Sequence, residues 1–100
     1  MADVLVFLAE GFEEIEALTV VDIVRRAGID VSTVSITHEN KVTGSHGITV
    51  TADELLLDVE VEDAKMIVLP GGMPGTKNLE ACDTLTRYVD DFSCVGKYIA

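Results

Sequence analysis

The stretch AEGFEEIE, residues 9–16, decides the fold that this chain is expected to adopt. It follows a continuous apolar run, Val4 to Ala9, which is typical of a buried central strand of a parallel sheet. Gly11 permits a tight turn. From Glu13 to Ala27 apolar residues recur at helical spacing. Because open α/β folds place their chemistry at the carboxyl ends of strands, we expect a functional site at this junction.

The segments that follow predict a right-handed strand–helix–strand unit. Gly28 is expected to end the helix, and a row of branched residues from Asp30 to Ile36 predicts a half-buried strand near a sheet edge. The other expected elements are a hairpin around residues 44–47, a short helical piece at 55–57, an apolar strand at 66–69, helices from about 76 and at about 83–92, and a strand beginning at 96.

Composition and charge narrow the classes of function. One hundred residues make one small domain or part of one, and the formal net charge is -11. Such acidity argues against nucleic acid and anionic membrane surfaces as partners. Two cysteines do not make a disulfide framework, and the first residues lack the features of a signal peptide or a membrane span. We therefore expect a cytoplasmic protein with neither nucleic acid nor membrane as a partner.

The glycine-rich loop PGGMPG, residues 70–75, allows three interpretations. It does not fit a nucleotide phosphate loop or a dinucleotide fingerprint, because the glycine spacing is wrong for both. The N–H groups of Gly71 and Gly72 could instead stabilise negative charge on a reacting oxygen, as an oxyanion hole does. A tight strand-to-helix turn without a binding role is the alternative.

The carboxylates at residues 10–16 argue against a flavin or nucleotide, since they would repel a phosphate at the helix N-terminus. We therefore expect no cofactor. Glu13 and Glu14 suit the positive end of the helix dipole. Glu16 borders the apolar face and is expected to be drawn inward, where a carboxyl group can stay protonated and donate a hydrogen bond. Glu16 is thus the candidate catalytic acid, and dipole capping is the alternative.

The cysteines and histidines show no pattern of reactivity. Neither Cys82 nor Cys94 lies in a strand-to-helix elbow such as G-x-S-x-G, so both are expected to be ordinary free cysteines. His38 and His46 lie in predicted turns and do not form a metal-spaced pair. We expect surface histidines and no metal site.

Three motifs occur in order along the chain. They are Gly11-Phe12-Glu13-Glu14-Ile15-Glu16 after an apolar strand, Asp22 with Arg25-Arg26-Ala27-Gly28-Ile29, and Val68-Leu69-Pro70-Gly71-Gly72. Together they resemble the DJ-1/ThiJ/PfpI superfamily, and the DJ-1-like branch fits best. The resemblance implies a flavodoxin-like three-layer α/β/α sandwich with a mostly parallel sheet, truncated after about half of the family fold. Residues 1–100 would be the N-terminal part of a single domain.

The resemblance also implies site residues. The family's reactive cysteine sits on an elbow after the strand that begins here at Gly96, beyond the last residue of this chain. By motif match, Glu16 is the acid that hydrogen-bonds to that cysteine, and Gly71 and Gly72 line the oxyanion side. Two further expectations concern anion or substrate binding, by Arg26 near a dimer interface and by His46 beside the site.

Two classes of function follow from the resemblance. The intact protein would be a cysteine-dependent enzyme acting on small reactive carbonyl compounds, as a glyoxalase or deglycase does, or an oxidative-stress sensor. A peptidase- or amidase-like member of this glutamine amidotransferase-like group, or a non-catalytic chaperone-like stress protein, is the alternative. A homodimer, or association with the remaining half of the protein, is expected. Lacking the nucleophile, this chain by itself is expected to be inactive.

Overall fold

The computed structural model describes residues 2–100, and its central feature is a five-stranded sheet. The order is β5-β2-β1-β6-β7, and every pairing in it is parallel. The predicted α/β class with a mostly parallel sheet is confirmed. The elements are β1 (Val4–Leu8), α1 (Glu14–Arg26), β2 (Val31–Ser35), β3 (Lys41–Thr43), β4 (Thr49–Thr51), β5 (Glu54–Leu55), β6 (Met66–Val68), α2 (Gly75–Glu80), α3 (Asp83–Cys94) and β7 (Tyr98–Ile99), with 3-10 turns at Leu56–Asp58 and Val61–Asp63.

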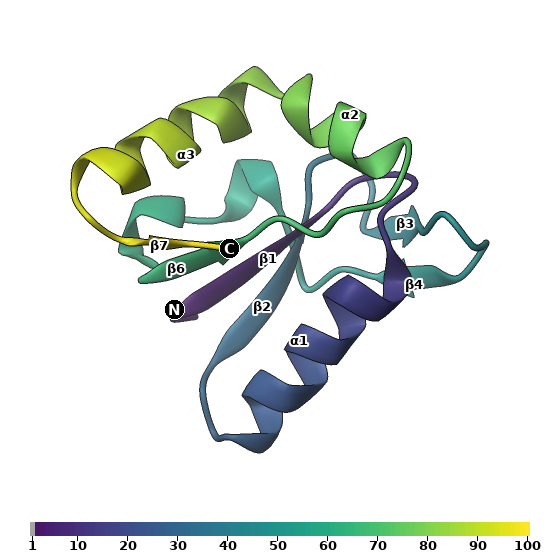
Figure 1. Ribbon diagram of the computed structural model, residues 1–100, viewed down its shortest axis with the longest axis horizontal. Coiled ribbons are helices and arrows are strands. Elements are labelled where there is room, and N and C mark those ends of the chain that lie inside the picture. Colours follow the sequence, from purple (N-terminus) through teal and green to yellow (C-terminus); the bar gives the residue numbers. More distant parts are fainter. Residues whose placement is uncertain (1) are drawn as a thin grey trace.

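Three layers arise because β1 is buried on both faces. Leu5 and Phe7 point to one side, where they belong to a core that includes Leu79 of α2 and Leu85 and Phe92 of α3. Val4, Val6 and Leu8 point to the other side and share a second core with Ala17 and Val21 of α1. Figure 1 shows the result, with α1 on one face of the sheet and α2 and α3 on the other. The alternation follows from the two-residue period of a strand.

Strand β2 is more buried than its sequence predicts. It lies between β1 and β5, one strand in from the edge, and only Ser32 is partly exposed. The polar Thr33 is satisfied by Asp53, whose carboxylate accepts from the Thr33 N–H at 2.9 Å. The Thr33 hydroxyl in turn accepts from the Asp53 N–H at 2.9 Å. The prediction of a half-buried strand was wrong because a distant segment, inserted beside β2, covers it.

Helix α1 spans Glu14–Arg26, inside the predicted range of 13–27. Its buried face is narrower than expected, however. Ile15 is 73% exposed and Ile23 is 59% exposed, although both are apolar residues of the predicted helix. The helix therefore presents apolar side chains on its outer surface as well as on the surface that packs on the sheet.

The C-terminal strand β7 pairs only with β6, so it forms an edge of the described sheet. Lys97 fixes the chain just before it. The Lys97 ammonium donates to the carbonyls of Glu62 and Ala64 and lies 4.9 Å from the centre of the Phe92 ring. Within residues 2–100, no helix combines the length and the apolar character needed to cross a membrane.

Candidate functional site

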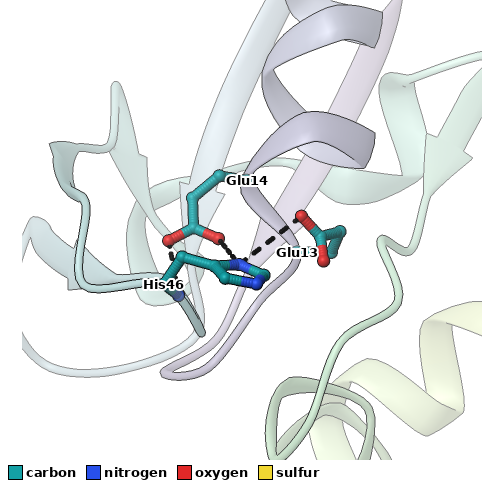
Figure 2. Close-up of side chains that lie close together, drawn as sticks. All are labelled: Glu13, Glu14 and His46. Carbon is teal, nitrogen blue, oxygen red and sulfur yellow. Dashed lines mark hydrogen bonds and ion pairs between the residues drawn. The ribbon is translucent and has the colours of Figure 1, made fainter.

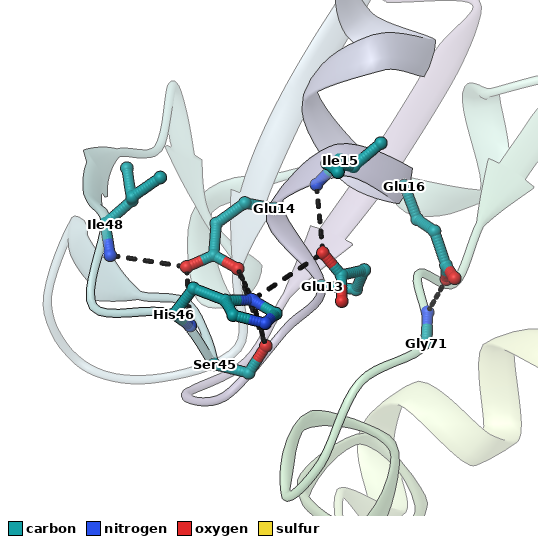
Figure 3. A network of polar contacts seen from close by, with 8 residues as sticks. All are labelled: Glu13, Glu14, Ile15, Glu16, Ser45, His46, Ile48 and Gly71. Carbon is teal, nitrogen blue, oxygen red and sulfur yellow. Dashed lines mark hydrogen bonds and ion pairs between the residues drawn. The ribbon is translucent and has the colours of Figure 1, made fainter.

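Three loops meet at the carboxyl ends of β1 and β6, as Figure 3 shows. They are the acidic loop before α1 at 9–13, the hairpin loop between β3 and β4 at 44–48, and the glycine-rich loop at 70–75. Backbone hydrogen bonds of 2.8 Å link them, from Gly11 N–H to Thr43 O, from Ser45 N–H to Phe12 O and from Glu13 N–H to Gly71 O. The acidic and glycine-rich loops thus face each other, and the hairpin loop is a third participant.

The glycine-rich loop approaches the acidic loop too closely for side chains. Gly72 has a φ of 101°, and a Cβ there would lie 2.6 Å from Glu13 N and 2.8 Å from Gly11 O. A Cβ on Gly75 would lie 2.7 Å from the same Gly11 oxygen. Glycine is required at these positions because the two backbones are in direct contact.

Glu16 joins α1 to the glycine-rich loop. Its Oε1 accepts a hydrogen bond of 2.7 Å from the Gly71 N–H, and its side chain is exposed. We expected Glu16 to be drawn inward, and that expectation was wrong. Glu14 is the buried carboxylate, because it shares a helix face with Ala17 and Val21 at intervals of three and seven residues. Glu16, two residues further on, points away from that face.

The two candidate oxyanion donors are not equivalent. The Gly71 N–H already donates to Glu16, so it is not free for a substrate oxygen. In the part of the chain that the structure describes, the Gly72 N–H donates no hydrogen bond. Of the two predicted groups, Gly72 is therefore the available donor, and Gly71 serves to hold the acid.

Glu14 is a site residue that the sequence reasoning assigned only to the helix dipole. Its side chain is 5% exposed and accepts from four donors of the hairpin loop. They are the His46 N–H at 2.8 Å, His46 Nδ1 at 2.9 Å, the Ile48 N–H at 3.3 Å and the Ser45 hydroxyl at 3.5 Å. The signal that could have revealed it is its helical spacing to Ala17 and Val21. Glu13, by contrast, caps the helix as expected, accepting from the Ile15 N–H at 3.3 Å.

The electrostatics of this junction centre on Glu14 and His46. Burial by itself would raise the pKa of Glu14, but the hydrogen bonds from the His46 ring and from the backbone outweigh it and lower the pKa from 4.5 to about 2. The hydrogen bond to Glu14, followed by the negative charges of Glu13 and Glu14, raises the pKa of His46 above 6.5 against the effect of burial. The pair is thus favoured as carboxylate and imidazolium.

A possible cation site among the described residues is formed by Glu13, Glu14 and His46 (Figure 2). One potential ligand atom of each residue lies within 4.8 Å of the other two. Four donors already engage the Glu14 oxygens, and one of them, the His46 ring, supplies a positive charge itself. We interpret the cluster as a hydrogen-bonded ion pair and assign no metal to it. That no metal binds here stays a prediction.

The two basic residues expected to bind an anion lie apart. His46 lies beside the first turn of α1, with Nδ1 3.8 Å from Glu13 and 2.9 Å from Glu14. Arg26 pairs with Asp22 at 3.0 Å in the last turn of the helix, ten residues or about 15 Å along the axis from Glu16. This chain therefore brings His46, but not Arg26, to the end of the sheet where Glu16 and Gly72 lie.

The ion pair predicts how stability depends on pH. Since the folded-state pKa of Glu14 is depressed, its contribution is present above pH 4.5 and is lost as the pH falls towards 2. Since the pKa of His46 is raised, its contribution is full below pH 6.5 and is lost as the pH rises through the folded-state value. Urea midpoints measured against pH should therefore decline on both sides of a window between 4.5 and 6.5.

In that experiment His46→Gln should flatten the alkaline decline, while His38→Gln, at the other and exposed histidine, should retain it. An alkaline decline that survives in His46→Gln would contradict the assignment.

An apolar hollow of about 320 Å³ adjoins the site, with Gly71, Leu79 and Leu85 among its lining residues. The hollow opens beside the glycine-rich loop, and residues of α2 and α3 line it.

Neither cysteine of this chain is the partner of Glu16. Cys82 packs against the core beneath the two helices, Cys94 is exposed, and among the described residues neither thiol hydrogen-bonds to Glu16. Both cysteines are free, as expected.

Comparison with known proteins places this arrangement in a family. The sequence model of the DJ-1/PfpI family matches residues 2–100. DJ-1 homolog B of Arabidopsis thaliana is 40% identical over 86 residues, which are 86% of this chain and 20% of that protein. A deglycase of Thermococcus kodakarensis is 35% identical over 69 residues, 69% of this chain and 41% of that protein.

The fold agrees with solved structures of the same group. The oxidized DJ-1 of Toxoplasma gondii superposes with a TM-score of 0.93 at 38% sequence identity, over 99% of this chain and 54% of that one. The chain thus spans about half the length of that structure and less of the other two proteins. The sequence match over residues 2–100 and the shared fold lead to one conclusion: the chain belongs to the DJ-1/PfpI family.

Proposed function

We propose that this chain supplies the acid and the oxyanion side of a cysteine-dependent site that acts on small reactive carbonyl compounds in the cytoplasm. The observation that carries the proposal is the 2.7 Å hydrogen bond between Gly71 and Glu16, beside an unengaged Gly72 N–H. The protein of full family length would contribute the thiolate. The deglycase of Thermococcus kodakarensis supports this substrate class, because it is 35% identical to this chain.

Each residue of the site has its own role in the proposed reaction. The thiolate sulfur forms a bond to the carbonyl carbon, and the electron pair of the C=O bond moves to the oxygen. The Gly72 N–H stabilises the resulting alkoxide. Glu16 takes up the proton of the thiol and passes it to that oxygen, which gives a hemithioacetal. Transfer of a proton from the sulfur-bearing carbon to the adjacent carbonyl carbon, and of the hydroxyl proton to the adjacent oxygen, then gives a thioester, and water releases it as a hydroxy acid and restores the thiol. Gly71 keeps Glu16 in place throughout, and the apolar hollow beside Gly71 would accept the small organic part of the substrate.

Substituting Glu16→Gln in the natural gene product tests the proposal, once an intact mass has shown that the product includes a cysteine elbow. With methylglyoxal as substrate, kcat/KM should fall about 100-fold, because the amide cannot transfer a proton. Glu39→Gln, at an exposed carboxylate in the turn after β2, should leave it unchanged. Turnover that persists in Glu16→Gln would remove Glu16 from the mechanism.

Peroxide sensing is a second candidate, supported by the oxidized state in which the Toxoplasma gondii DJ-1 was solved. Each of two peroxide molecules would transfer one oxygen atom to the sulfur and leave as water, which gives a sulfinate that protonated Glu16 hydrogen-bonds. A gain of two oxygen atoms in the mass of peroxide-treated protein, without carbonyl turnover, would favour sensing. Failure of both assays would favour a chaperone-like role instead.

A homodimer is the partner that the surface favours. Ile15 and Ile23 on α1 and Ile48 on the hairpin are all more than half exposed. Exposed apolar side chains that form one continuous patch mark an association surface. Sedimentation of the natural gene product is the measurement, and a monomer at micromolar concentration would exclude this partner.

A further inference from the structure

We propose that Glu14 and His46 form a latch that positions Glu16 against the glycine-rich loop, and that a proton on His46 closes this latch. Neither residue is assigned such a part by the chemistry proposed above. The inference concerns the regulation of the same site and rests on that proposal for its catalytic consequence, although the contacts themselves can be measured without any turnover.

The hairpin loop is built around Glu14. The carboxylate is 5% exposed and accepts four hydrogen bonds, all from residues 45–48. Gly44 leaves room for it, because a Cβ there would overlap the Glu14 carboxyl group. Figure 3 shows the side chain directed from the start of α1 into this loop. The hairpin and the first turn of the helix are therefore held together by one side chain.

The same helical turn also holds the glycine-rich loop. Glu13, the preceding residue, donates its N–H to Gly71 O at 2.8 Å. Glu16, two residues later, accepts from Gly71 N–H at 2.7 Å. Both polar groups of Gly71 are thus bonded to residues that flank Glu14. A displacement of the first turn of α1 must alter both bonds, because the helix moves as a rigid unit over so few residues.

The charged groups at this junction are three carboxylates and the His46 ring. His46 Nδ1 lies 2.9 Å from Glu14 and 3.8 Å from Glu13, and no lysine or arginine of residues 2–100 pairs with either carboxylate. The loop before the helix adds a third negative group, Glu10, whose carboxylate accepts from the Thr43 N–H at 3.3 Å. The glycine-rich loop faces this junction without a charged residue, and Lys41, the other cation of the hairpin, lies at its start opposite Thr51.

The imidazolium is therefore the positive charge between two carboxylates at the start of α1. Loss of its proton leaves at most one hydrogen bond from a neutral imidazole to the Glu14 carboxylate and removes the attraction to Glu13. The carboxylates of Glu13 and Glu14 then repel each other with no positive charge between them, and the hairpin is held less tightly against the helix. Because the pKa of His46 is raised above 6.5, this change is displaced towards neutral pH.

The test is an NMR titration of the natural gene product from about pH 5.5 to about pH 9, a range in which ordinary carboxylates stay ionised. The Gly71 amide proton should shift with a single inflection that coincides with the titration of the His46 imidazole. Its protection from hydrogen exchange, corrected for the intrinsic pH dependence, should fall roughly threefold across the same inflection, as expected for loss of a partly exposed ion pair.

The variants decide what causes the shift. In His46→Gln, which keeps a polar side chain but cannot titrate, the Gly71 inflection should vanish, and in His38→Gln it should remain. Glu16→Gln should remove most of the response, because the Gly71 N–H then loses its charged acceptor. If His46→Gln proves unfolded, the wild-type comparison of the His46 and Gly71 inflections still decides the question. A Gly71 amide that is insensitive to His46, in wild type or variant, would overturn the latch.

This readout separates the latch from the catalytic proposal. If the Gly71 response follows His46 but Glu16→Gln leaves turnover of the natural gene product untouched, the latch stands and the catalytic role of Glu16 falls. If turnover depends on Glu16 while the Gly71 amide does not respond to His46, the catalytic role of Glu16 stands and the latch falls.

Discussion

Replacing Phe12 with alanine should lower the free energy of unfolding by about 3–5 kcal/mol, the range for removing a fully buried aromatic ring. Phe12 has no exposed surface, although acidic residues surround it in the sequence. Its ring belongs to the core between α1 and the sheet, together with Val6 and Leu8 of β1. The ring fixes the acidic loop to that core, so its loss should both open a cavity and release the loop.

Urea denaturation followed by far-UV circular dichroism measures the effect of Phe12→Ala. Ile15→Ala is a matched control, because Ile15 is apolar, three residues away and 73% exposed. We expect it to change stability by no more than about 0.5 kcal/mol. Should Phe12→Ala fail to fold, Phe12→Leu, with a smaller loss of volume, should give an intermediate value. Equal values for Phe12→Ala and Ile15→Ala would show that the loop is not anchored as described.

Gly72→Ala should cost about 3 kcal/mol or more, from backbone strain of about 1–3 kcal/mol and overpacking of a similar size. The strain arises because φ is 101°, and the overpacking because the new methyl group would lie 2.6 Å from Glu13 N. The backbones at residues 72 and 13 meet in the site. Neither backbone can move away from the new methyl group without disturbing the Glu13–Gly71 hydrogen bond of 2.8 Å.

Gly28→Ala separates the two contributions to this cost. Gly28 also has a positive φ, 78°, but no atom lies within 4 Å of a Cβ built there. Only strain remains, so we expect a loss of about 1 kcal/mol. The same urea series measures both variants. If Gly72→Ala costs no more than Gly28→Ala, the close contact between the glycine-rich and acidic loops does not exist in solution.

Much of the fold could be predicted because its signals are local. The apolar run at 4–9 and the helical period after Gly11 are properties of neighbouring residues, and they located β1 and α1 to within one or two positions. The glycines at 71 and 72 likewise indicated a tight turn between a strand and a helix. The burial of β2 could not be predicted, since it depends on β5 and Asp53, some twenty residues further along the chain.

In the candidate site, too, local features could be predicted and contacts with distant segments could not. The sequence by itself determined that four carboxylates stand at a strand-to-helix junction and that a glycine-rich loop follows a second strand, because spacing and turn chemistry are local. Helical spacing to Ala17 and Val21 puts Glu14 on the buried face of α1, but only the tertiary structure decided that a carboxylate could stay there. Glu14 lies inside because a hairpin loop more than thirty residues away supplies four donors, whereas Glu16 stays exposed and takes the N–H of Gly71. A charge is buried only where donors converge on it, and no local pattern records donors contributed from so far along the chain.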